Sequence, residues 1–293
     1  MAPILPPLPP AVPGECVVRA GLACYVDGSG PPLLLVHTVN AAASAAEVRP
    51  LYEHYRRKRT VFALDLPGFG ASDRSDHDYT PRLMTDALHA VLELARERCG
   101  DLPVDALGAS LGCEFLARAA MERPQRFRRI ALVSPTGLMG TKARRGPPGA
   151  SRGLPTLHRI LSQPLWAEAI YRSLTRPGVI RYFLERTWGG KAIDEDLWAY
   201  DVITARQPGA RFAPLHFLAA NLFSADIHAV YESLDHPIWA SHGTRGDFTD
   251  YRGLPLVTGK GNWKVTVYEG GALPYFEHRA TFLREMDTFL GAD

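Results

Sequence analysis

The sequence lacks the features that mark several large classes of protein. None of its apolar runs approaches about 20 residues, so we expect no membrane-spanning helix and no membrane partner. Its 33 basic and 31 acidic side chains leave a net charge of only +2, which gives no reason to expect a nucleic-acid partner. The N-terminal stretch MAPILPPLPPAVPGE has no basic segment and is broken by prolines, so we predict no signal peptide and a cytoplasmic protein.

Cysteine is also scarce. The four cysteines show no C-x-x-C spacing; they are Cys16, Cys24, Cys99 and Cys113. We predict reduced, buried thiols rather than a disulfide or zinc set, and we expect no metal and no cofactor. The N-terminal prolines favour an extended arm that lies on the surface or reaches a partner.

What the sequence does contain is an alternation of short apolar runs and helical patterns. Residues 32–36, 61–64 and 129–133 read as strands buried on both faces, and helical spacing follows at 41–57 and from Thr80 to about 98. Two short strands around Gly21 predict a hairpin, residues 264–268 a last strand, and residues 279–290 a closing helix. We therefore predict an α/β fold with a mostly parallel central sheet and helices on both faces. Reacting groups should gather at the carboxyl ends of its strands, where His37, Asp65, Ser110 and Ser134 stand.

The most informative stretch is VDALGASLGCEFLAR, residues 104–118. It predicts a strand, a sharp turn carrying G-x-S-x-G, and a helix, which is the context of a nucleophile elbow. Side chains at Gly108 and Gly112 would clash in so tight a turn, and the turn lifts Ser110 to the N-terminus of a helix, where negative charge is favoured.

Residues 137–228 differ from the rest of the chain in composition and in sequence pattern. A basic segment rich in Gly and Pro, residues 141–153, predicts an exposed linker, with a phosphate-binding patch as the alternative. Helical patterns rich in aromatic residues then continue to about Phe223. We predict a helical cap whose aromatics mostly pack against one another, with a few lining an apolar pocket.

Four segments together resemble the α/β-hydrolase superfamily, specifically its lidded branch: LLLVH at 33–37, DLPGFGASD at 65–73, GASLG at 108–112 and PIWASHGTRGD at 237–247. The resemblance implies an α/β-hydrolase fold in which residues 1–136 and 229–293 form the core and residues 137–228 the cap.

The resemblance also implies a triad of serine, histidine and carboxylate. Ser110 would be the nucleophile and Asp247 the acid, with Asp250 the less favoured choice. In the segment GALPYFE, residues 271–277, Ala272 stands where the family keeps its histidine. Removing a triad member typically costs about 10⁴–10⁶-fold in rate, so Ala272 makes the predicted triad incomplete.

Three explanations of Ala272 stay open. The alanine is an engineered change; or the base has moved, with His242 as the best-placed substitute, His37 next, and His278 facing the closing helix; or the lineage has abandoned triad hydrolysis. A second departure favours the last explanation, because the glycine that usually follows the loop histidine is Thr38 here.

The same loop should carry the oxyanion site. Thr38, Val39 and Asn40 replace the usual glycine turn, and we expect Thr38 and Asn40 to offer side-chain donors beside the backbone N–H of Leu111. The sequence thus predicts an enzyme acting on a small, mainly apolar ester, thioester or related carbonyl compound. The alternative is a non-hydrolytic protein of the same fold, either a lyase-type enzyme or a ligand-binding pseudo-hydrolase. The oligomeric state stays open.

Overall fold

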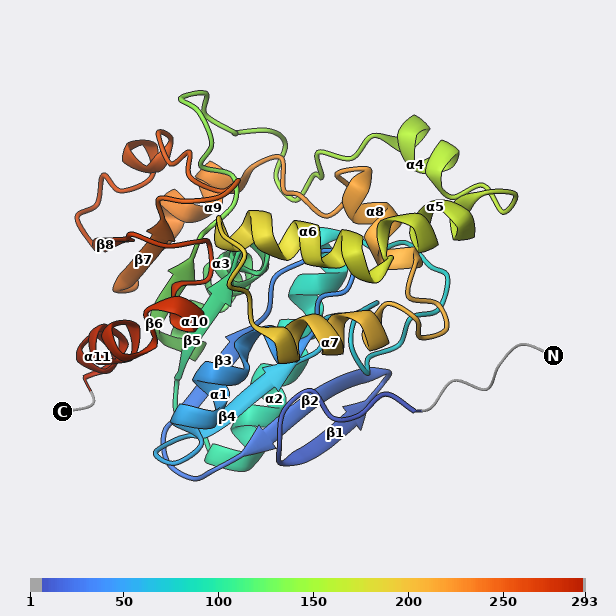
Figure 1. The fold of residues 1–293 in the computed structure, drawn as a ribbon. Coiled ribbons are helices and arrows are strands. Elements are labelled where there is room, and N and C mark those ends of the chain that lie inside the picture. The colour runs from blue at the N-terminus through green and yellow to red at the C-terminus, as the bar shows by residue number, and fades with distance from the viewer. Residues whose placement is uncertain (1–6, 292–293) are drawn as a thin grey trace.

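The computed structural model describes residues 7–291. Its centre is an eight-stranded sheet of order β1-β2-β4-β3-β5-β6-β7-β8 (Figure 1). β1 and β2 form an antiparallel hairpin, β2 pairs antiparallel with β4, and the remaining pairs are parallel. The strands are β1 (Glu15–Arg19), β2 (Leu22–Asp27), β3 (Pro32–Val36), β4 (Thr60–Leu64), β5 (Val104–Ala109), β6 (Phe127–Val133), β7 (Ile238–Gly243) and β8 (Trp263–Tyr268). The predicted α/β architecture is confirmed.

Alternate residues of the inner strands feed two separate apolar layers. Leu34 and Val36 pack with α2 (Pro81–Cys99) and α3 (Gly112–Glu122), whereas Leu33 and Leu35 pack with α1 (Arg49–Tyr55) and α11 (Arg279–Leu290). All five residues of β3 are buried, as expected of a strand covered by helices on both faces.

The helix expected over residues 41–57 is shorter than predicted. A 3-10 turn, η1 (Ala45–Val48), leads into α1 at Arg49. The preceding residues form a loop in which the side chain of Asn40 accepts a hydrogen bond from the backbone of Ala42 at 2.7 Å. Helix α2, by contrast, begins as predicted, because the Thr80 hydroxyl accepts from the N–H of Leu83 at 3.2 Å.

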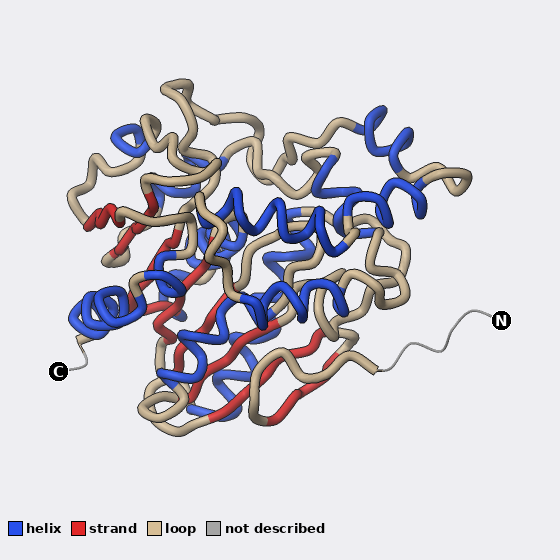
Figure 2. The backbone as a smooth tube through the Cα atoms, in the orientation of Figure 1, coloured by secondary structure: helices blue, strands red, loops and turns tan. Residues whose placement is uncertain are grey.

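Between β6 and β7 the chain forms a helical insertion, and the described residues of this segment add no strand to the sheet. It follows a long loop (Figure 2) and gathers at one end of the sheet (Figure 1). Its helices are α4 (Pro155–Leu161), α5 (Ala167–Leu174), α6 (Pro177–Trp188), α7 (Glu195–Thr204) and α8 (Phe212–Leu218), with α9 (Ile227–Ser233) crossing its end. The core is completed by α10 (Pro274–Glu277) and two 3-10 turns, η2 (Pro124–Arg126) and η3 (Leu254–Leu256).

Hydrogen bonds tie the insertion to the core. The Tyr171 hydroxyl donates to the carbonyl of Ala41 at 2.9 Å, and the Tyr200 hydroxyl donates to the carbonyl of Pro9 at 2.8 Å. The second bond fixes part of the proline-rich arm; the rest of that arm, residues 1–6, lies outside the described residues. Burial of the insertion's aromatics is uneven: Trp188 is buried in the core, whereas Tyr182 and Phe183 are about half exposed.

The cysteines differ from the expectation in one respect. All four are free, but Cys16 is exposed on the edge strand and Cys99 is only partly buried, so the prediction of buried thiols holds for Cys24 and Cys113 alone. In the part of the chain described, we find no helix with the length and apolar character that a membrane crossing requires.

Candidate active site

Ser110 occupies the sharp turn that the sequence predicts. It follows β5 directly and precedes α3, with φ of 51°, a left-handed conformation that is strained for a serine. Its N–H donates to the carbonyl of Val133 at 2.8 Å, and its carbonyl accepts from the N–H of Cys113 at 3.1 Å. The side chain is half-buried. The strand, turn and helix therefore have the geometry of a nucleophile elbow.

The two glycines differ in how strictly the turn requires them. A Cβ at Gly112 would lie 2.4 Å from the carbonyl oxygen of His37, an overlap that backbone on both sides cannot relieve. At Gly108 the closest approach is 3.1 Å, to Cys113. The steric prediction is confirmed in full for Gly112 and more weakly for Gly108.

Gly112→Ala should therefore destabilise the protein by about 1–3 kcal/mol or more, through overpacking at the elbow. Gly178→Ala is a matched control, because Gly178 is also near the start of a helix and a Cβ there meets no atom within 4 Å. Urea unfolding of both variants checks this: the control should equal or exceed the wild type in stability. Equal stabilities for the two variants would contradict the steric account.

The ends of several strands meet beside Ser110. Ser134, which follows β6, also has a left-handed backbone with φ of 48°, and its N–H donates to the carbonyl of Ser241 on β7 at 2.7 Å. Its hydroxyl donates to the carbonyl of Ala272 at 2.6 Å. Because Ser110 is bonded to the residue before Ser134, this contact brings the loop of Ala272 to the neighbourhood of the elbow.

Asp247 is engaged by an arginine rather than a histidine. Its carboxylate accepts two hydrogen bonds from the Arg186 guanidinium of α6, at 2.5 and 2.6 Å, and it is exposed to solvent. The N–H of Ala272 donates to the carbonyl of Thr187 at 2.9 Å, so the end of α6 touches both predicted triad loops. Asp250 instead pairs with Arg252 and accepts from the N–H of Gly140.

The candidate histidines differ in their freedom to take a proton. His37 is fully buried, with Nδ1 bonded to the carbonyl of Thr38 at 2.5 Å and Nε2 accepting from the N–H of Leu66 at 3.0 Å. Burial lowers the pKa of His37 to about 4. Since both ring nitrogens are occupied, His37 is a structural histidine of the loop, and its suggested role as base does not fit this geometry.

The other two histidines lie at the margins of the site. His242 is half-buried, stacks on Tyr251 at 3.9 Å between ring centroids, and has Nδ1 3.1 Å from the carbonyl of Gly243. His278 precedes α11 and stacks on Tyr268, with Nε2 3.3 Å from the carbonyl of Glu269. Among the described residues, neither histidine forms a hydrogen bond with Ser110.

The oxyanion loop carries an unexpected partner, Glu47. This fully buried carboxyl accepts from the N–H of Thr38 at 2.8 Å, from its hydroxyl at 2.9 Å and from the amide of Asn40 at 2.6 Å. Glu47 therefore engages the side-chain donors of Thr38 and Asn40 that we expected to face an oxyanion. Val39 is buried in the apolar core. The backbone of Leu111, at the start of α3, remains the oxyanion donor to consider.

Comparison with known proteins agrees with this geometry. Residues 31–180 match the model of a family described as the alpha/beta hydrolase fold. The chain belongs to the α/β-hydrolase family. The match includes the segments at 33–37, 65–73 and 108–112, and with them the elbow, whereas the segment at 237–247 lies outside it.

Curated relatives match only part of the chain. A 2-hydroxymuconate semialdehyde hydrolase of Pseudomonas sp. (strain CF600) is 29% identical over 129 residues, 43% of this chain and 44% of the relative. A pimeloyl-[acyl-carrier protein] methyl ester esterase of Xylella fastidiosa is 33% identical over 100 residues, 34% and 35% of the two chains. The chain thus spans less than two thirds of the length of these relatives.

Solved structures match over nearly the whole length. The 2-hydroxy-6-oxo-6-phenylhexa-2,4-dienoate hydrolase of Rhodococcus sp. (strain RHA1) aligns with a TM-score of 0.72 at 19% identity, covering 92% of this chain and 95% of that one. An esterase of Exiguobacterium antarcticum aligns with a TM-score of 0.70 at 15% identity, covering 95% and 100%. At such identities the likeness shows the shared fold.

Glu47 is the site residue that the sequence analysis missed. Burial raises its pKa to about 7, partly offset by the hydrogen bonds from Thr38 and Asn40. Asp201 of α7 is also fully buried, and burial, together with the nearby Glu47, raises its pKa well above the ordinary value. The spacing Ser44-x-x-Glu47 was available as a signal, but it predicts a helix-capping glutamate rather than one that holds a loop.

The raised pKa gives a pH dependence of stability. Because the pKa of Glu47 in the folded protein lies above its ordinary value of 4.5, the folded state binds a proton that the unfolded state releases between about pH 4.5 and 7. The stabilising contribution is complete below that range and is lost as pH rises through it. The free energy of unfolding of the wild type minus that of Glu47→Gln should fall by about 3 kcal/mol from pH 4.5 to 8. Urea titrations at several pH values measure this difference; a constant or rising difference would refute it.

Proposed function

We propose that the protein is a serine-hydrolase-type enzyme that acts on a small, mainly apolar ester, thioester or related carbonyl compound through Ser110. The observation that carries the proposal is the elbow: a serine held in a left-handed backbone at the start of α3 and partly exposed to solvent. Strain of this kind costs about 1–3 kcal/mol and is typically kept at functional sites. The relatives' names, a semialdehyde hydrolase and a methyl ester esterase, support chemistry at a carbonyl group.

In this proposal the Ser110 oxygen attacks the carbonyl carbon, and the developing oxyanion lies against the N–H of Leu111 at the positive end of α3. The proton of the hydroxyl passes to His242 or to water, because His37 has no free nitrogen. Without a well-placed imidazole this transfer is slow, so turnover should be low compared with a complete triad.

The proposed loss of the histidine is natural rather than engineered. If the alanine were engineered, we would expect the carboxylate of the acid to have no other partner and to remain free to bond an imidazole. Here Arg186 fills that role for Asp247 with two hydrogen bonds, and the loop that replaces the usual His-Gly turn is held by Glu47. The histidine position, the acid and the oxyanion loop then all differ from the family pattern, which fits a lineage that has moved away from standard triad hydrolysis.

The helical insertion, residues 137–228, serves in this proposal as the lid of the site. Support comes from the end of α6, where Thr187 bonds the Ala272 loop and Arg186 bonds Asp247. Buried apolar side chains of α6 and α7, such as Trp188 and Leu197, then form the roof over the substrate.

A panel of p-nitrophenyl esters and acyl thioesters of increasing chain length tests the proposal. The wild type should hydrolyse at least one member, and Ser110→Ala should reduce that rate to the uncatalysed background. Ser134→Ala is the matched control, because Ser134 also follows a parallel strand with a left-handed backbone; it should retain activity within a few-fold. Unchanged turnover in Ser110→Ala would refute the proposal.

The second candidate is a non-hydrolytic role on the same site, either a lyase-type reaction or binding without turnover. It is favoured by one observation, the full engagement of Asp247 by Arg186, which leaves no carboxylate to orient a base. It predicts that a carbonyl compound from the panel raises the melting temperature without forming a hydrolysis product.

A further inference from the structure

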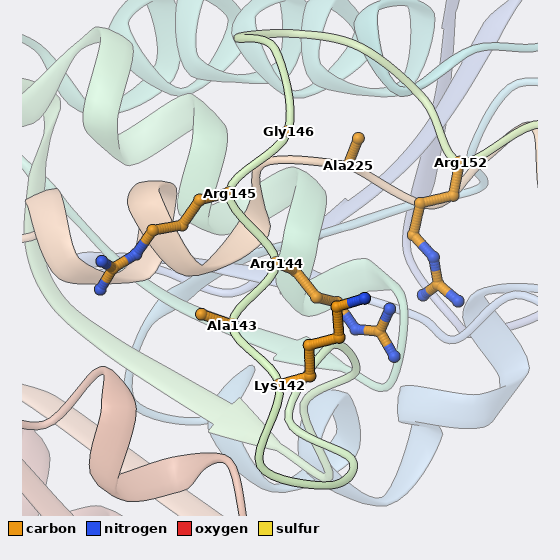
Figure 3. Close-up of a pocket in the computed structure, with 7 residues that line it drawn as sticks. All are labelled: Lys142, Ala143, Arg144, Arg145, Gly146, Arg152 and Ala225. Atoms are coloured by element: carbon orange, nitrogen blue, oxygen red, sulfur yellow. The ribbon is translucent and has the colours of Figure 1, made fainter.

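The basic segment of the helical insertion lines a cavity of about 400 Å³ (Figure 3). Four of the lining residues are cations: Lys142, Arg144, Arg145 and Arg152. Figure 3 shows Lys142, Arg144 and Arg152 pointing toward one another, while Arg145 points away from them. Three positive side chains therefore share this cavity.

The loop that carries these cations is largely exposed, as the sequence predicted, and hydrogen bonds hold it in place. The N–H of Arg144 donates to Nδ1 of His228 at 3.1 Å, and the N–H of His228 donates back to the carbonyl of Arg144 at 3.2 Å. Further along, the N–H of Gly146 donates to Ala225 at 2.9 Å and that of Arg152 to Phe223 at 2.8 Å. A loop held at both ends of the cavity presents its side chains in a defined arrangement.

The three cations that face the cavity lack acidic partners. Arg145 is paired with Glu232, but Lys142, Arg144 and Arg152 form no ion pair with any described residue. The Nε atom of Arg144 is buried without a hydrogen-bond acceptor. Burial and the like charge of the nearby Arg144 lower the pKa of Arg152.

One further contact orients the site. The guanidinium of Arg152 lies over the ring of Phe223, 5.3 Å from its centroid, and this cation–π contact favours one orientation of the guanidinium plane. A buried carboxyl, that of Glu114, acts on Arg152 only at a distance, since its oxygens accept from Thr136 and from the N–H of Ser224. The positive charge at the cavity is therefore left for an outside anion.

We propose that this cavity binds the phosphate groups of a small phosphorylated ligand, preferably a diphosphate. Two guanidinium forks match the paired oxygens of phosphate, and a lysine adds a third, mobile charge. An anion of two or more negative charges can accept from the terminal N–H groups of both guanidinium forks and offset the like charges of Arg144 and Arg152. The proposal does not depend on the reaction assigned to Ser110.

Isothermal titration of the full chain with sodium pyrophosphate, at constant ionic strength and neutral pH, tests it. The wild type should bind one pyrophosphate, and Arg144→Gln/Arg152→Gln should weaken binding by at least about tenfold. Arg145→Gln is the matched control from the same loop and should change affinity by less than about twofold, since Arg145 is held by Glu232. Urea unfolding confirms that each variant is folded.

Several results would overturn the proposal. They are the absence of pyrophosphate binding in the wild type, equal affinity for sulfate, or equal weakening by Arg145→Gln, which would indicate only a diffuse positive surface. A labelled single-stranded oligonucleotide is titrated in parallel. If it binds more tightly than pyrophosphate and loses affinity in the double variant, the site belongs to a nucleic acid and the small-ligand proposal is wrong.

Discussion

Ala272→His is expected to raise the rate of ester hydrolysis by about 10²–10⁴-fold, the range that a positioned general base contributes. The reason is local: the Ala272 carbonyl is bonded to Ser134, whose neighbour Val133 is bonded to Ser110, so a side chain at 272 starts beside the elbow. The ester panel proposed for the wild type measures the gain as kcat/KM. The gain should disappear in Ala272→His/Ser110→Ala.

Asp247 decides how much of this gain is realised. In the wild type its carboxylate is held by Arg186, so a new histidine would lack its orienting partner. Ala272→His/Arg186→Ala should therefore be faster than Ala272→His alone, although Arg186→Ala alone should have little effect on turnover. Ala272→Asn is the control for crowding, because Ala272 is 4% exposed and any larger side chain must displace neighbours. If a folded Ala272→His is no faster than Ala272→Asn, residue 272 does not face Ser110.

Asp226→Ala should cost about 3–5 kcal/mol in the free energy of unfolding, the usual effect of breaking a buried ion pair. Asp226 and Arg118 of the elbow helix α3 are bonded with side-chain exposures of 6% and 5%. Asp226 also accepts from the N–H of Gly149 at 2.8 Å. Removing the carboxylate leaves the Arg118 guanidinium buried without a counter-charge, and it releases the loop that carries the basic cavity.

Urea unfolding measures the loss, with Asp235→Ala as control. Asp235 is bonded to Lys260 but lies on the surface, so its removal should change stability little. The double variant Arg118→Met/Asp226→Leu should recover much of the loss, because apolar residues can replace a buried pair. A loss from Asp226→Ala no larger than that from Asp235→Ala would contradict the account.

The parts of the fold that could be predicted are those written in local patterns. Strands covered on both faces read as unbroken apolar runs, as in residues 32–36, and the Thr80-Pro81 pair marked the start of α2. The elbow was equally readable, because its strand, turn and helix occupy one short stretch around Ser110.

What could not be predicted are contacts between residues far apart in the sequence. The pairing of Arg186 with Asp247 joins α6 to a loop 61 residues later, and no local pattern signals it. Glu47 is close to Thr38, but its spacing from Ser44 resembles an ordinary helix cap, so its role emerges only when the chain is folded. The exposure of Cys16 depends on β1 being an edge strand, which the order of strands in the sheet decides.

The turn around Ser110 and the groups predicted to activate this serine differ in how well they follow the family pattern. Ser110 and the turn around it follow the family pattern, and they support attack on a carbonyl. The segments predicted to form the oxyanion loop and to supply the acid do not follow it: Glu47 holds Thr38 and Asn40, and Arg186 holds Asp247. The proposed enzyme therefore keeps the nucleophile and one backbone donor, while the groups that usually activate the serine are engaged elsewhere.

Covalent labelling of Ser110 tests this account most directly. Long incubation of the wild type with a fluorophosphonate, followed by intact-mass and peptide analysis, should give a single adduct on Ser110 that forms slowly. The adduct should be absent in Ser110→Ala, retained in Ser134→Ala, and formed much faster in Ala272→His. A folded wild type that stays unlabelled under conditions that modify an ordinary esterase, or an adduct on another residue, would contradict the claim that Ser110 is the reacting group.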